Sequence, residues 1–209
     1  MRFRPVSFDR LVEEVADRID ALDAEVAPWP RIAIDGAPPA GPQALADALA
    51  GPLRVRGRPV LRVRAGDFLR PASLRFEHGR TDPDAYYDDW LDAGGLLREV
   101  LEPLDPGGTG RVLPSLWNPV TDRATRAEYV TLPPGGVVLV DGALLLGRWL
   151  PFDFTVHLQQ SPAALARHTD DADRWRLPAY QRYDSEVDPQ TVADLVVRVE
   201  DPRRPAVLE

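Results

Sequence analysis

Apolar residues near the start of the chain recur at the spacing of an amphipathic helix. Between residues 7 and 26 they stand three or four positions apart, which gathers them on one helical face. Ser7 or Asp9 occupies the position where the N-cap of such a helix is expected. We therefore predict a helix over about residues 7–26 that packs on the body of the protein.

Further along the chain, short apolar runs alternate with stretches of helical or mixed pattern. Residues 59–66 form one such run, in which apolar and arginine side chains alternate from Leu61 to Arg64. The other runs that indicate buried strands span residues 31–34, 137–140, 154–158 and 193–199. We predict a helix at about 42–50 and, over 83–104, one helix or two short ones, weakened at Gly94-Gly95.

Strands that alternate with helices indicate a parallel α/β sheet covered on both faces. Ligands of such sheets bind at the carboxyl ends of the strands, so the residues that follow each predicted strand are candidates for a site. These segments are residues 35–43, 64–70, 141–145 and 158–176. We expect them to surround whatever the protein binds.

The composition excludes several classes of function. The 209 residues fit one domain, and the formal net charge of −8 argues against nucleic-acid binding, which needs a basic face. The chain has no cysteine, and no apolar run of the roughly 20 residues that span a membrane. Its charged start does not resemble a secretory signal, so we expect a cytoplasmic protein without a membrane partner. All 25 basic residues are arginines, so no lysine can serve any site.

The turn after the first strand has part of the pattern of a nucleotide-binding loop. In the phosphate loop G-x-x-x-x-G-K-[ST], backbone N–H groups and the lysine hold phosphates while the hydroxyl binds magnesium. Gly36 and Gly41 have this separation, but Pro42 and Gln43 follow them. Three of the residues from 37 to 43 are prolines, which have no N–H group. The alternative interpretation is a tight strand-to-helix turn that binds no phosphate.

Five segments in order resemble the uridine kinase family of P-loop kinases, particularly its shorter bacterial members. IAIDGAPPAG is similar to the first strand and phosphate loop, AGDFLRP to the strand-two signature, GRTDPDAYYDDW to the acceptor-side segment, LPSLWNPVTDR to the base-binding stretch and VVLVDGALLL to the Walker B strand. The Arg-rich segment at about 166–182 resembles a shortened lid. The resemblance implies a single P-loop NTPase-like domain over residues 1–209, a three-layer α/β sandwich with a mostly parallel sheet of about five strands.

The resemblance also implies ATP and magnesium as cofactors. The sequence departs from the family, however, at the positions that bind phosphate, magnesium and substrate. Pro42 removes the lysine that holds phosphate oxygens, and Gln43 is a poor magnesium ligand. At the strand-two signature, Gly66 stands where the family has its catalytic base, and Asp67 follows one place later. In the base-binding stretch, Trp117, Asn118 and Asp122 replace the expected Tyr, Asp and His. Both cofactors are therefore in doubt.

Each candidate residue has a role implied by the resemblance and a structural alternative. Asp67 and Asp141 are the candidate catalytic residues, as base and as magnesium- or water-positioning group; alternatively they cap turns. The candidate phosphate-binding residues are Gly36, Gly41, Gln43, Arg64, Arg174 and Arg176. The candidate substrate-binding residues are Arg70, Asp84, Tyr86, Trp117 and Asp122. The arginines could instead be solvated or ion-paired, and Trp117 could pack in the core.

The three histidines give no signal of catalysis or metal binding. His157 lies within a predicted strand, where we expect a ring with satisfied hydrogen bonds, and His78 and His168 are isolated. No pair of histidines has the spacing of metal ligands, so we expect no protein-held metal centre.

Two hypotheses of function follow. The first is a uridine-kinase-like phosphotransferase in which Arg64 or a lid arginine partly replaces the lysine and Asp67 acts as base. The second is a non-catalytic nucleoside- or nucleotide-binding or regulatory protein that keeps the acceptor side after losing the ATP side. Nucleotide hydrolysis by Asp67 and Asp141 is a weaker third alternative. The departures in the loop favour impaired phosphoryl transfer from ATP. The resemblance suggests a small-molecule nucleoside or nucleotide as the partner, and it allows a homo-oligomer.

Overall fold

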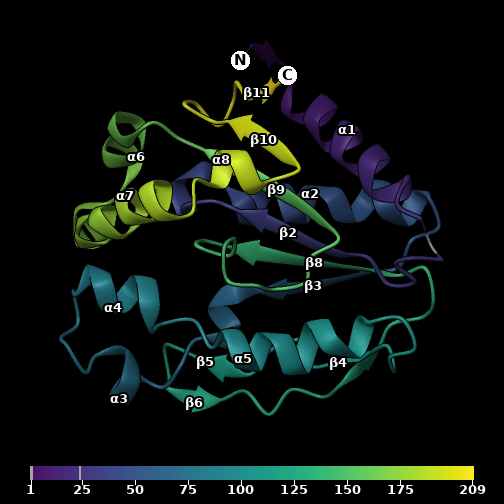
Figure 1. The fold of residues 1–209 in the computed structure, drawn as a ribbon, viewed down its shortest axis with the longest axis horizontal. Coiled ribbons are helices and arrows are strands. Elements are labelled where there is room, and N and C mark those ends of the chain that lie inside the picture. Colours follow the sequence, from purple (N-terminus) through teal and green to yellow (C-terminus); the bar gives the residue numbers. More distant parts are fainter. Residues whose placement is uncertain (1, 24) are drawn as a thin grey trace.

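A seven-stranded, mostly parallel sheet forms the centre of the protein (Figure 1). The structure is a computed structural model and describes residues 2–23 and 25–209. Five parallel strands lie in the order β10 (Leu195–Arg198), β9 (Phe154–Gln159), β2 (Arg31–Asp35), β8 (Val137–Gly142) and β3 (Val60–Arg64). They correspond to the five predicted strands, and the predicted α/β class is confirmed.

Two short antiparallel strands extend the sheet beyond β10. β11 (Ala206–Leu208) pairs with β10, and β1 (Phe3–Pro5) pairs with β11 at the edge. The sequence did not predict either strand, because three residues are too few to establish an apolar period. As a result, the first and last described segments of the chain lie side by side (Figure 1).

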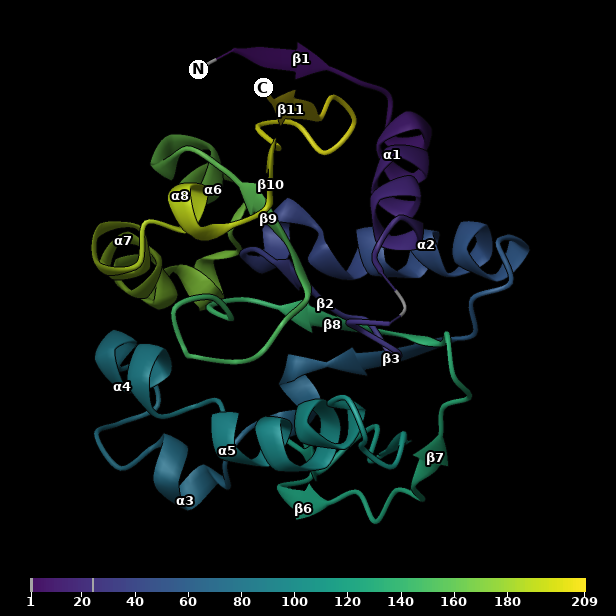
Figure 2. The same cartoon turned by 45° about the vertical axis from the view of Figure 1, so that its right-hand side comes forward.

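Helices α1 (Phe8–Asp20) and α2 (Pro42–Val55) pack on one face of the sheet (Figure 2). Ser7 is the N-cap of α1, since its hydroxyl accepts a hydrogen bond from the N–H of Arg10 at 3.2 Å. The helix ends at Asp20, before the predicted end at about 26. Residue 24 of that prediction, like residue 1 of the predicted domain 1–209, lies outside the described residues.

The opposite face of the sheet is covered by helical segments from the middle of the chain. After α3 (Ala72–Arg75) and α4 (Pro83–Asp88) come α5 (Ala93–Leu96), a π-helical turn η3 (Leu97–Leu101) and a 3-10 turn η4 (Glu102–Leu104). The segment is divided, as the alternative of two short helices allowed, but the break lies before α5 and not at Gly94-Gly95. Asp92 caps α5 by accepting a hydrogen bond from the N–H of Gly95 at 2.8 Å. The glycines therefore lie inside its first turn.

The lid-like segment is a series of short helices that packs against α4. It contains α6 (Pro162–His168), η5 (Asp171–Arg176) and α7 (Leu177–Glu186), and α8 (Pro189–Val192) leads on to β10. Arg182 on α7 forms ion pairs with Asp84 at 3.2 Å and Asp88 at 2.8 Å, both on α4. The rest of the described chain adds two small two-stranded sheets: β4 (Arg111–Val112) with β7 (Val130–Thr131), and β5 (Trp117–Asn118) with β6 (Arg123–Ala124).

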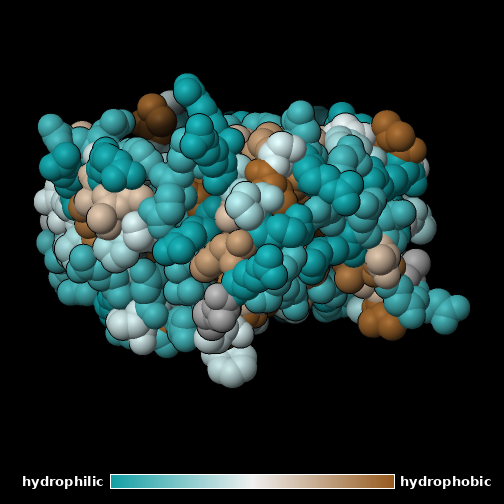
Figure 3. Space-filling model, turned by 90° about the horizontal axis from the view of Figure 1, so that it is seen from above, coloured by the Kyte–Doolittle hydropathy of each residue, from teal (hydrophilic) through white to brown (hydrophobic). Residues whose placement is uncertain are grey.

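The surface over the termini and α1 is mostly hydrophilic, with apolar side chains in small separate patches (Figure 3). Among the large apolar side chains that are almost fully exposed, Val120 and Trp149 belong to loops and Val55 is the last residue of α2. Within the described parts of the chain, no helix combines the length and apolar character needed to cross a membrane.

Candidate functional site

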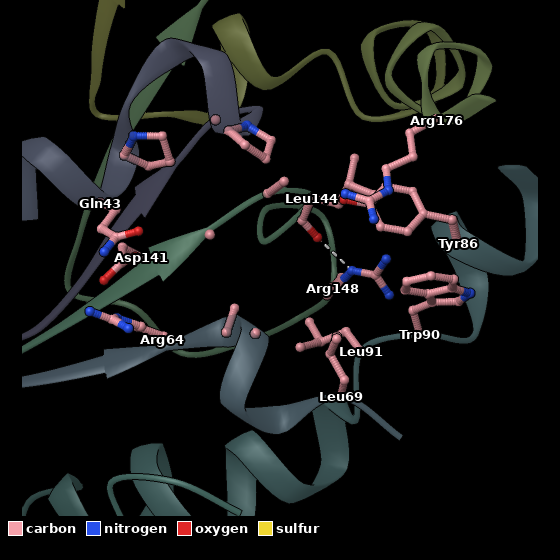
Figure 4. A pocket seen from close by; sticks show the side chains of 17 residues that line it. Gln43, Arg64, Leu69, Tyr86, Trp90, Leu91, Asp141, Leu144, Arg148 and Arg176 are labelled. Atoms are coloured by element: carbon pink, nitrogen blue, oxygen red, sulfur yellow. Dashed lines mark hydrogen bonds between the residues drawn. The ribbon is translucent and has the colours of Figure 1, made fainter. Parts of the chain in front are cut away.

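A pocket of about 320 Å³ lies at the carboxyl ends of β2, β3 and β8, where parallel α/β sheets bind their ligands (Figure 4). Residues that follow these strands form its polar end, together with the start of α2. Residues of α4, of the loop after it and of the lid form its aromatic end. The volume falls in the range typical of small-molecule sites.

The loop between β2 and α2 forms one wall of the pocket and has few free N–H groups. Its three prolines have no N–H group, and two of them begin the 3-10 turn η1 (Pro38–Ala40). Three more N–H groups donate to backbone carbonyls: Gly36 to Gly142, Ala40 to Ala37 and Gly41 to Pro38, at 2.9, 2.8 and 3.1 Å. In the described loop 36–43, only Ala37 and Gln43 keep an N–H without such a bond. Because anion nests need several convergent N–H groups, this loop is poorly suited to phosphate.

The two glycines of this loop have structural reasons to be glycine. Gly41 has φ = +81°, a left-handed conformation that L side chains rarely adopt. A Cβ atom on Gly36 would lie 3.0 Å from the Cβ of Leu158 and 3.1 Å from its carbonyl oxygen. Both residues are therefore compatible with the tight-turn interpretation as well as with a phosphate loop.

Gln43, Arg64 and Asp141 meet at the polar end of the pocket (Figure 4). Gln43 belongs to the first turn of α2, Arg64 ends β3 and Asp141 lies near the end of β8. The register pairs Arg64 with Asp141 on adjacent strands, which brings the two residues to the same edge of the sheet. The structure thus brings together three residues that the sequence placed at or just beyond the ends of predicted strands.

The carboxylate of Asp141 is buried and already has a cationic partner. Arg62 on β3 forms an ion pair with Asp141 and another with Asp47 on α2. The side chain of Asp141 is 6% exposed and that of Arg62 is 17% exposed, so water screens this pair little. Arg62 therefore neutralises the Walker-B-like carboxylate from within the protein.

Four rings and an arginine form the aromatic end of the pocket and its backing. Tyr86 packs edge-on against Trp90, with 5.2 Å between ring centroids, and also against Trp175 at 5.6 Å. The Tyr86 hydroxyl shares a hydrogen bond of 3.1 Å with that of Tyr180 on α7. The Arg176 guanidinium lies over Tyr86 and Trp175, 5.1 Å from each centroid. These contacts hold the lid against α4.

Arg148 is a second arginine at this end of the pocket, on the loop after β8. Its Nε donates to the carbonyl oxygen of Leu144 at 2.6 Å, and its Nη2 donates to that of Tyr87. No ion pair joins it to a carboxylate in the described residues. Burial lowers the pKa of the Arg148 guanidinium, because the charged form loses its hydration.

A buried polar network lies behind the pocket and joins three elements. Asp35, at the end of β2, is fully buried and accepts hydrogen bonds from the Leu145 N–H at 2.9 Å and the Tyr183 hydroxyl at 3.1 Å. Its other neighbour is Nδ1 of His157 on β9, at 2.7 Å. His157 is therefore a core histidine with a hydrogen-bond partner, as the sequence predicted. Asp35 and Tyr183 were not predicted as partners, because they are distant in sequence.

The structure places six of the sequence-predicted site residues on the pocket wall: Gly36, Gln43, Arg64, Tyr86, Asp141 and Arg176. Asp67 lies in the short helix η2 (Ala65–Phe68) and is not among the lining residues. Burial raises the pKa of its carboxyl; Arg64 lowers it and Asp141 raises it to smaller degrees. Gly41 sits behind the wall, and Arg174 pairs with Asp171 on the surface of the lid.

The other predicted substrate-binding residues do not line this pocket, because each has a structural partner elsewhere. Asp84 pairs with Arg182, and Arg70 pairs with Asp89 at 3.5 Å. The indole N–H of Trp117 donates to Asp122 at 3.0 Å, and the same carboxylate oxygen accepts the N–H of Ala72 at 2.8 Å. Residues 113–123, the segment that resembles a base-binding stretch, thus form hydrogen bonds with one another and with α3.

Sequence reasoning missed three residues that shape the pocket: Arg62, Trp90 and Arg148. Arg62 was predicted to share one face of its strand with Arg64, and nothing in the sequence indicated that it pairs with Asp141 on β8. Trp90 belonged to the predicted helix 83–104, in which any aromatic residue could equally be core. Arg148 lies in an irregular loop, so the only available signal was its place soon after a strand end.

Comparison with solved structures identifies the fold. The chain is similar to a candidate uridine kinase from Bacillus stearothermophilus, with a TM-score of 0.71 and 20% identity over 88% of this chain and 96% of that one. A candidate fructose transport system kinase from Silicibacter sp. TM1040 gives 0.64 and 21%, over 87% and 96%. The YGR205w protein gives 0.63 and 10%, over 98% and 100%.

At the level of sequence, no protein-family profile and no curated protein matches the chain. Identities of this size to solved structures establish the fold alone. The three neighbours nevertheless share the layered sheet and cover almost the whole chain. The chain therefore has a P-loop kinase-like fold, and the resemblance of its five segments is confirmed at that level.

Proposed function

We propose that this protein binds a nucleoside or nucleotide in the pocket at the end of its sheet and that its ATP-dependent phosphoryl transfer is lost or strongly impaired. One of its structural neighbours is described as a candidate uridine kinase, which fits a ligand of this class. The fold supplies the site, and the residues at the two ends of the pocket decide what can happen there.

The ion pair between Arg62 and Asp141 is the observation that carries this proposal. Phosphoryl transfer in P-loop enzymes requires magnesium, held with help from a Walker B aspartate and a loop hydroxyl. Here the aspartate is neutralised by a guanidinium, and Gln43 stands in place of the hydroxyl. A second cation at Asp141 would have to displace Arg62 or repel it. The residues present therefore do not fit magnesium–ATP.

The loop and the acceptor side support the same conclusion. Single preorganised donors are worth about 2.7–4 kcal/mol of transition-state stabilisation, and this loop lacks a lysine and most of its amide donors. Gly66 leaves no carboxylate at the position of the expected base, and Asp67 does not line the pocket. The aromatic end, in contrast, keeps Tyr86 and Trp90 as surfaces for a ring-shaped ligand.

Calorimetric titration with Mg-ATP, uridine and UMP tests the proposal, together with an assay of ADP production over a panel of nucleosides. We expect uridine or UMP to bind, no ADP production above background, and no tight binding of Mg-ATP. Tight Mg-ATP binding with turnover would instead establish the first hypothesis, an active phosphotransferase in which an arginine replaces the lysine.

A further inference from the structure

The pocket is electropositive although the protein is acidic. The formal net charge of the chain is −8, yet the charged residues that line the pocket are three arginines, Arg64, Arg148 and Arg176, and one aspartate, Asp141. Arg62 neutralises that aspartate from outside the pocket. The charges that remain available to a ligand are therefore positive, which favours an anion.

Arg148 is partly buried and, unlike the buried arginines Arg31 and Arg75, forms no ion pair with a carboxylate among the described residues. Arg31, for example, is 8% exposed and pairs with Asp105 and with Asp153, the latter at 2.9 Å. Arg148 has only two carbonyl oxygens as hydrogen-bond acceptors in the described structure. A partly buried guanidinium loses part of its hydration, and no carboxylate compensates that loss here, so its place on the pocket wall points to a ligand that supplies the counter-charge.

Arg176 lies on the same side of the pocket as Arg148, next to Tyr86 (Figure 4). It pairs with Asp173 on the lid at 3.1 Å, but its Nε is buried and has no hydrogen-bond partner in the described structure. Its guanidinium is fixed in place by the rings beneath it. Two forked cations are thus preorganised on one wall, and guanidinium groups bind phosphate through paired hydrogen bonds.

We propose that the pocket binds a phosphomonoester of a ring-bearing small molecule, of the class of nucleoside monophosphates, with its phosphate held by Arg148 and Arg176. The aromatic and aliphatic wall of Trp90, Leu69 and Leu91 receives the ring. A phosphomonoester has more charge and more acceptor oxygens than a carboxylate, which matches two guanidiniums. This inference deepens the proposed function and rests on it for the ring, but not for the anion.

The test is calorimetry of the full chain with four probes: UMP, uridine, ribose 5-phosphate and inorganic phosphate. We expect UMP to bind at least tenfold more tightly than uridine and both phosphate-only probes. Arg148→Met should weaken UMP binding by about 10- to 100-fold, the range of a charge-assisted hydrogen bond, and weaken uridine binding much less. Arg148→Lys should weaken UMP binding less than Arg148→Met does. Arg98→Met, at an arginine remote from the pocket whose side chain is 63% exposed, is the matched control.

Thermal unfolding of the same variants separates ligand binding from a structural role. Arg148→Met should remain folded with a small loss of stability, because it gives up two hydrogen bonds to the carbonyl oxygens of Leu144 and Tyr87. Equal affinity for UMP and uridine, or a UMP preference that survives both Arg148→Met and Arg176→Met, would overturn the inference. If ribose 5-phosphate or inorganic phosphate bound through Arg148 as tightly as UMP, the phosphate site would be supported and the assignment to a nucleoside monophosphate would be wrong. ATP turnover would refute only the proposed loss of transfer, and binding of none of the four probes would refute both proposals.

Discussion

Arg62 reaches from β3 across to Asp141 on β8 and to Asp47 on α2. Because Arg62 and Asp141 are both largely buried, removing one of them leaves the other as an uncompensated charge in a region of low dielectric. The same ion pair thus has two effects. It holds the edge strand against its neighbour and α2, and it removes a negative charge from the pocket.

We predict that Arg62→Met lowers the free energy of unfolding by about 3–5 kcal/mol, the typical cost of breaking a buried ion pair from one side. The double variant Arg62→Met with Asp141→Asn should recover a large part of this loss, because no unpaired charge remains. Denaturant unfolding of the two variants and of Asp141→Asn completes the cycle.

Asp47→Asn is the control for this prediction, because the carboxylate of Asp47 is 59% exposed and its ion pair should contribute less than about 1 kcal/mol. Equal losses in Arg62→Met and in the double variant would show that the charge of Asp141 is not what Arg62 compensates.

Asp184 on α7 has a carboxylate whose negative charge is unfavourable in the folded state. Burial raises the pKa of its carboxyl, so the folded protein binds this proton more tightly than the unfolded chain does. The ionised carboxylate therefore lowers stability at neutral pH, and this loss disappears as the pH falls through the folded-state pKa.

We predict that Asp184→Asn raises the free energy of unfolding at pH 7 and that the gain shrinks toward acidic pH, as measured by urea unfolding at several pH values. Asp171→Asn, at an almost fully exposed lid carboxylate, should change stability little at any of these pH values. A gain that is constant with pH would mean that packing, and not ionisation, distinguishes the asparagine.

At the scale of elements, the hydroxyl of Tyr183 joins α7 to the sheet. Tyr183 donates to Asp35 on β2 and accepts the N–H of Leu146, at 3.1 and 3.0 Å. The preceding residue of the helix, Arg182, pairs with α4. The lid-like segment is thus fixed both to the end of the central strand and to the helix that lines the pocket, which keeps the aromatic wall in place.

We predict that Tyr183→Phe lowers the free energy of unfolding by about 1–3 kcal/mol, because it leaves the buried N–H of Leu146 without a partner. Tyr129→Phe, which removes an exposed hydroxyl bonded to Glu99, should cost much less. Chemical denaturation measures both. Hydrogen exchange of α7 should also increase in Tyr183→Phe, and unchanged exchange there would argue against its anchoring role.

The elements that the sequence predicted well are those with a long apolar pattern. Strands β2, β8, β9 and β10 were found because each is a short, largely buried apolar run. Strand β3 was found because apolar and arginine side chains alternate along it, and Ser7 because its capping role is local. The break before α5 was misplaced because the cap from Asp92 outweighs the weakness of two glycines. Contacts between distant segments, such as Arg62 with Asp141, leave no pattern in one sequence.

At the scale of the whole molecule, the order of the strands explains why half of the candidate site came together. Gly36, Arg64 and Asp141 lie at the carboxyl ends of strands that are adjacent in the sheet, so their meeting is a consequence of the fold. Residues carried over from the acceptor-side motifs, such as Asp84 and Trp117, depend on loops and helices packed outside the sheet. Those segments have their own ion pairs and hydrogen bonds, which the sequence did not reveal.

The history of the loop between β2 and α2 can be tested on the intact protein. We predict that Pro42→Lys with Gln43→Thr strengthens Mg-ATP binding at least tenfold, because it restores an ammonium group, an N–H donor and a hydroxyl. Turnover should remain low, since Arg62 still holds Asp141 and Gly66 still lacks a carboxylate.

The control is Pro42→Ala with Gln43→Ala, which restores only the N–H donor. Calorimetry with Mg-ATP compares the two variants. If they bind Mg-ATP equally weakly, the loop is a strand-to-helix turn and not a degenerate phosphate loop.

The edge formed by β1 and β11 brings the two ends of the chain within hydrogen-bond distance. The N–H of Glu209 donates to the carbonyl oxygen of Arg2 at 2.9 Å. This edge lies at the opposite side of the sheet from β3, which borders the pocket. A tether attached to either end would therefore leave the pocket facing solution on a biosensor surface, and a few added residues could close the backbone into a ring for circular permutation.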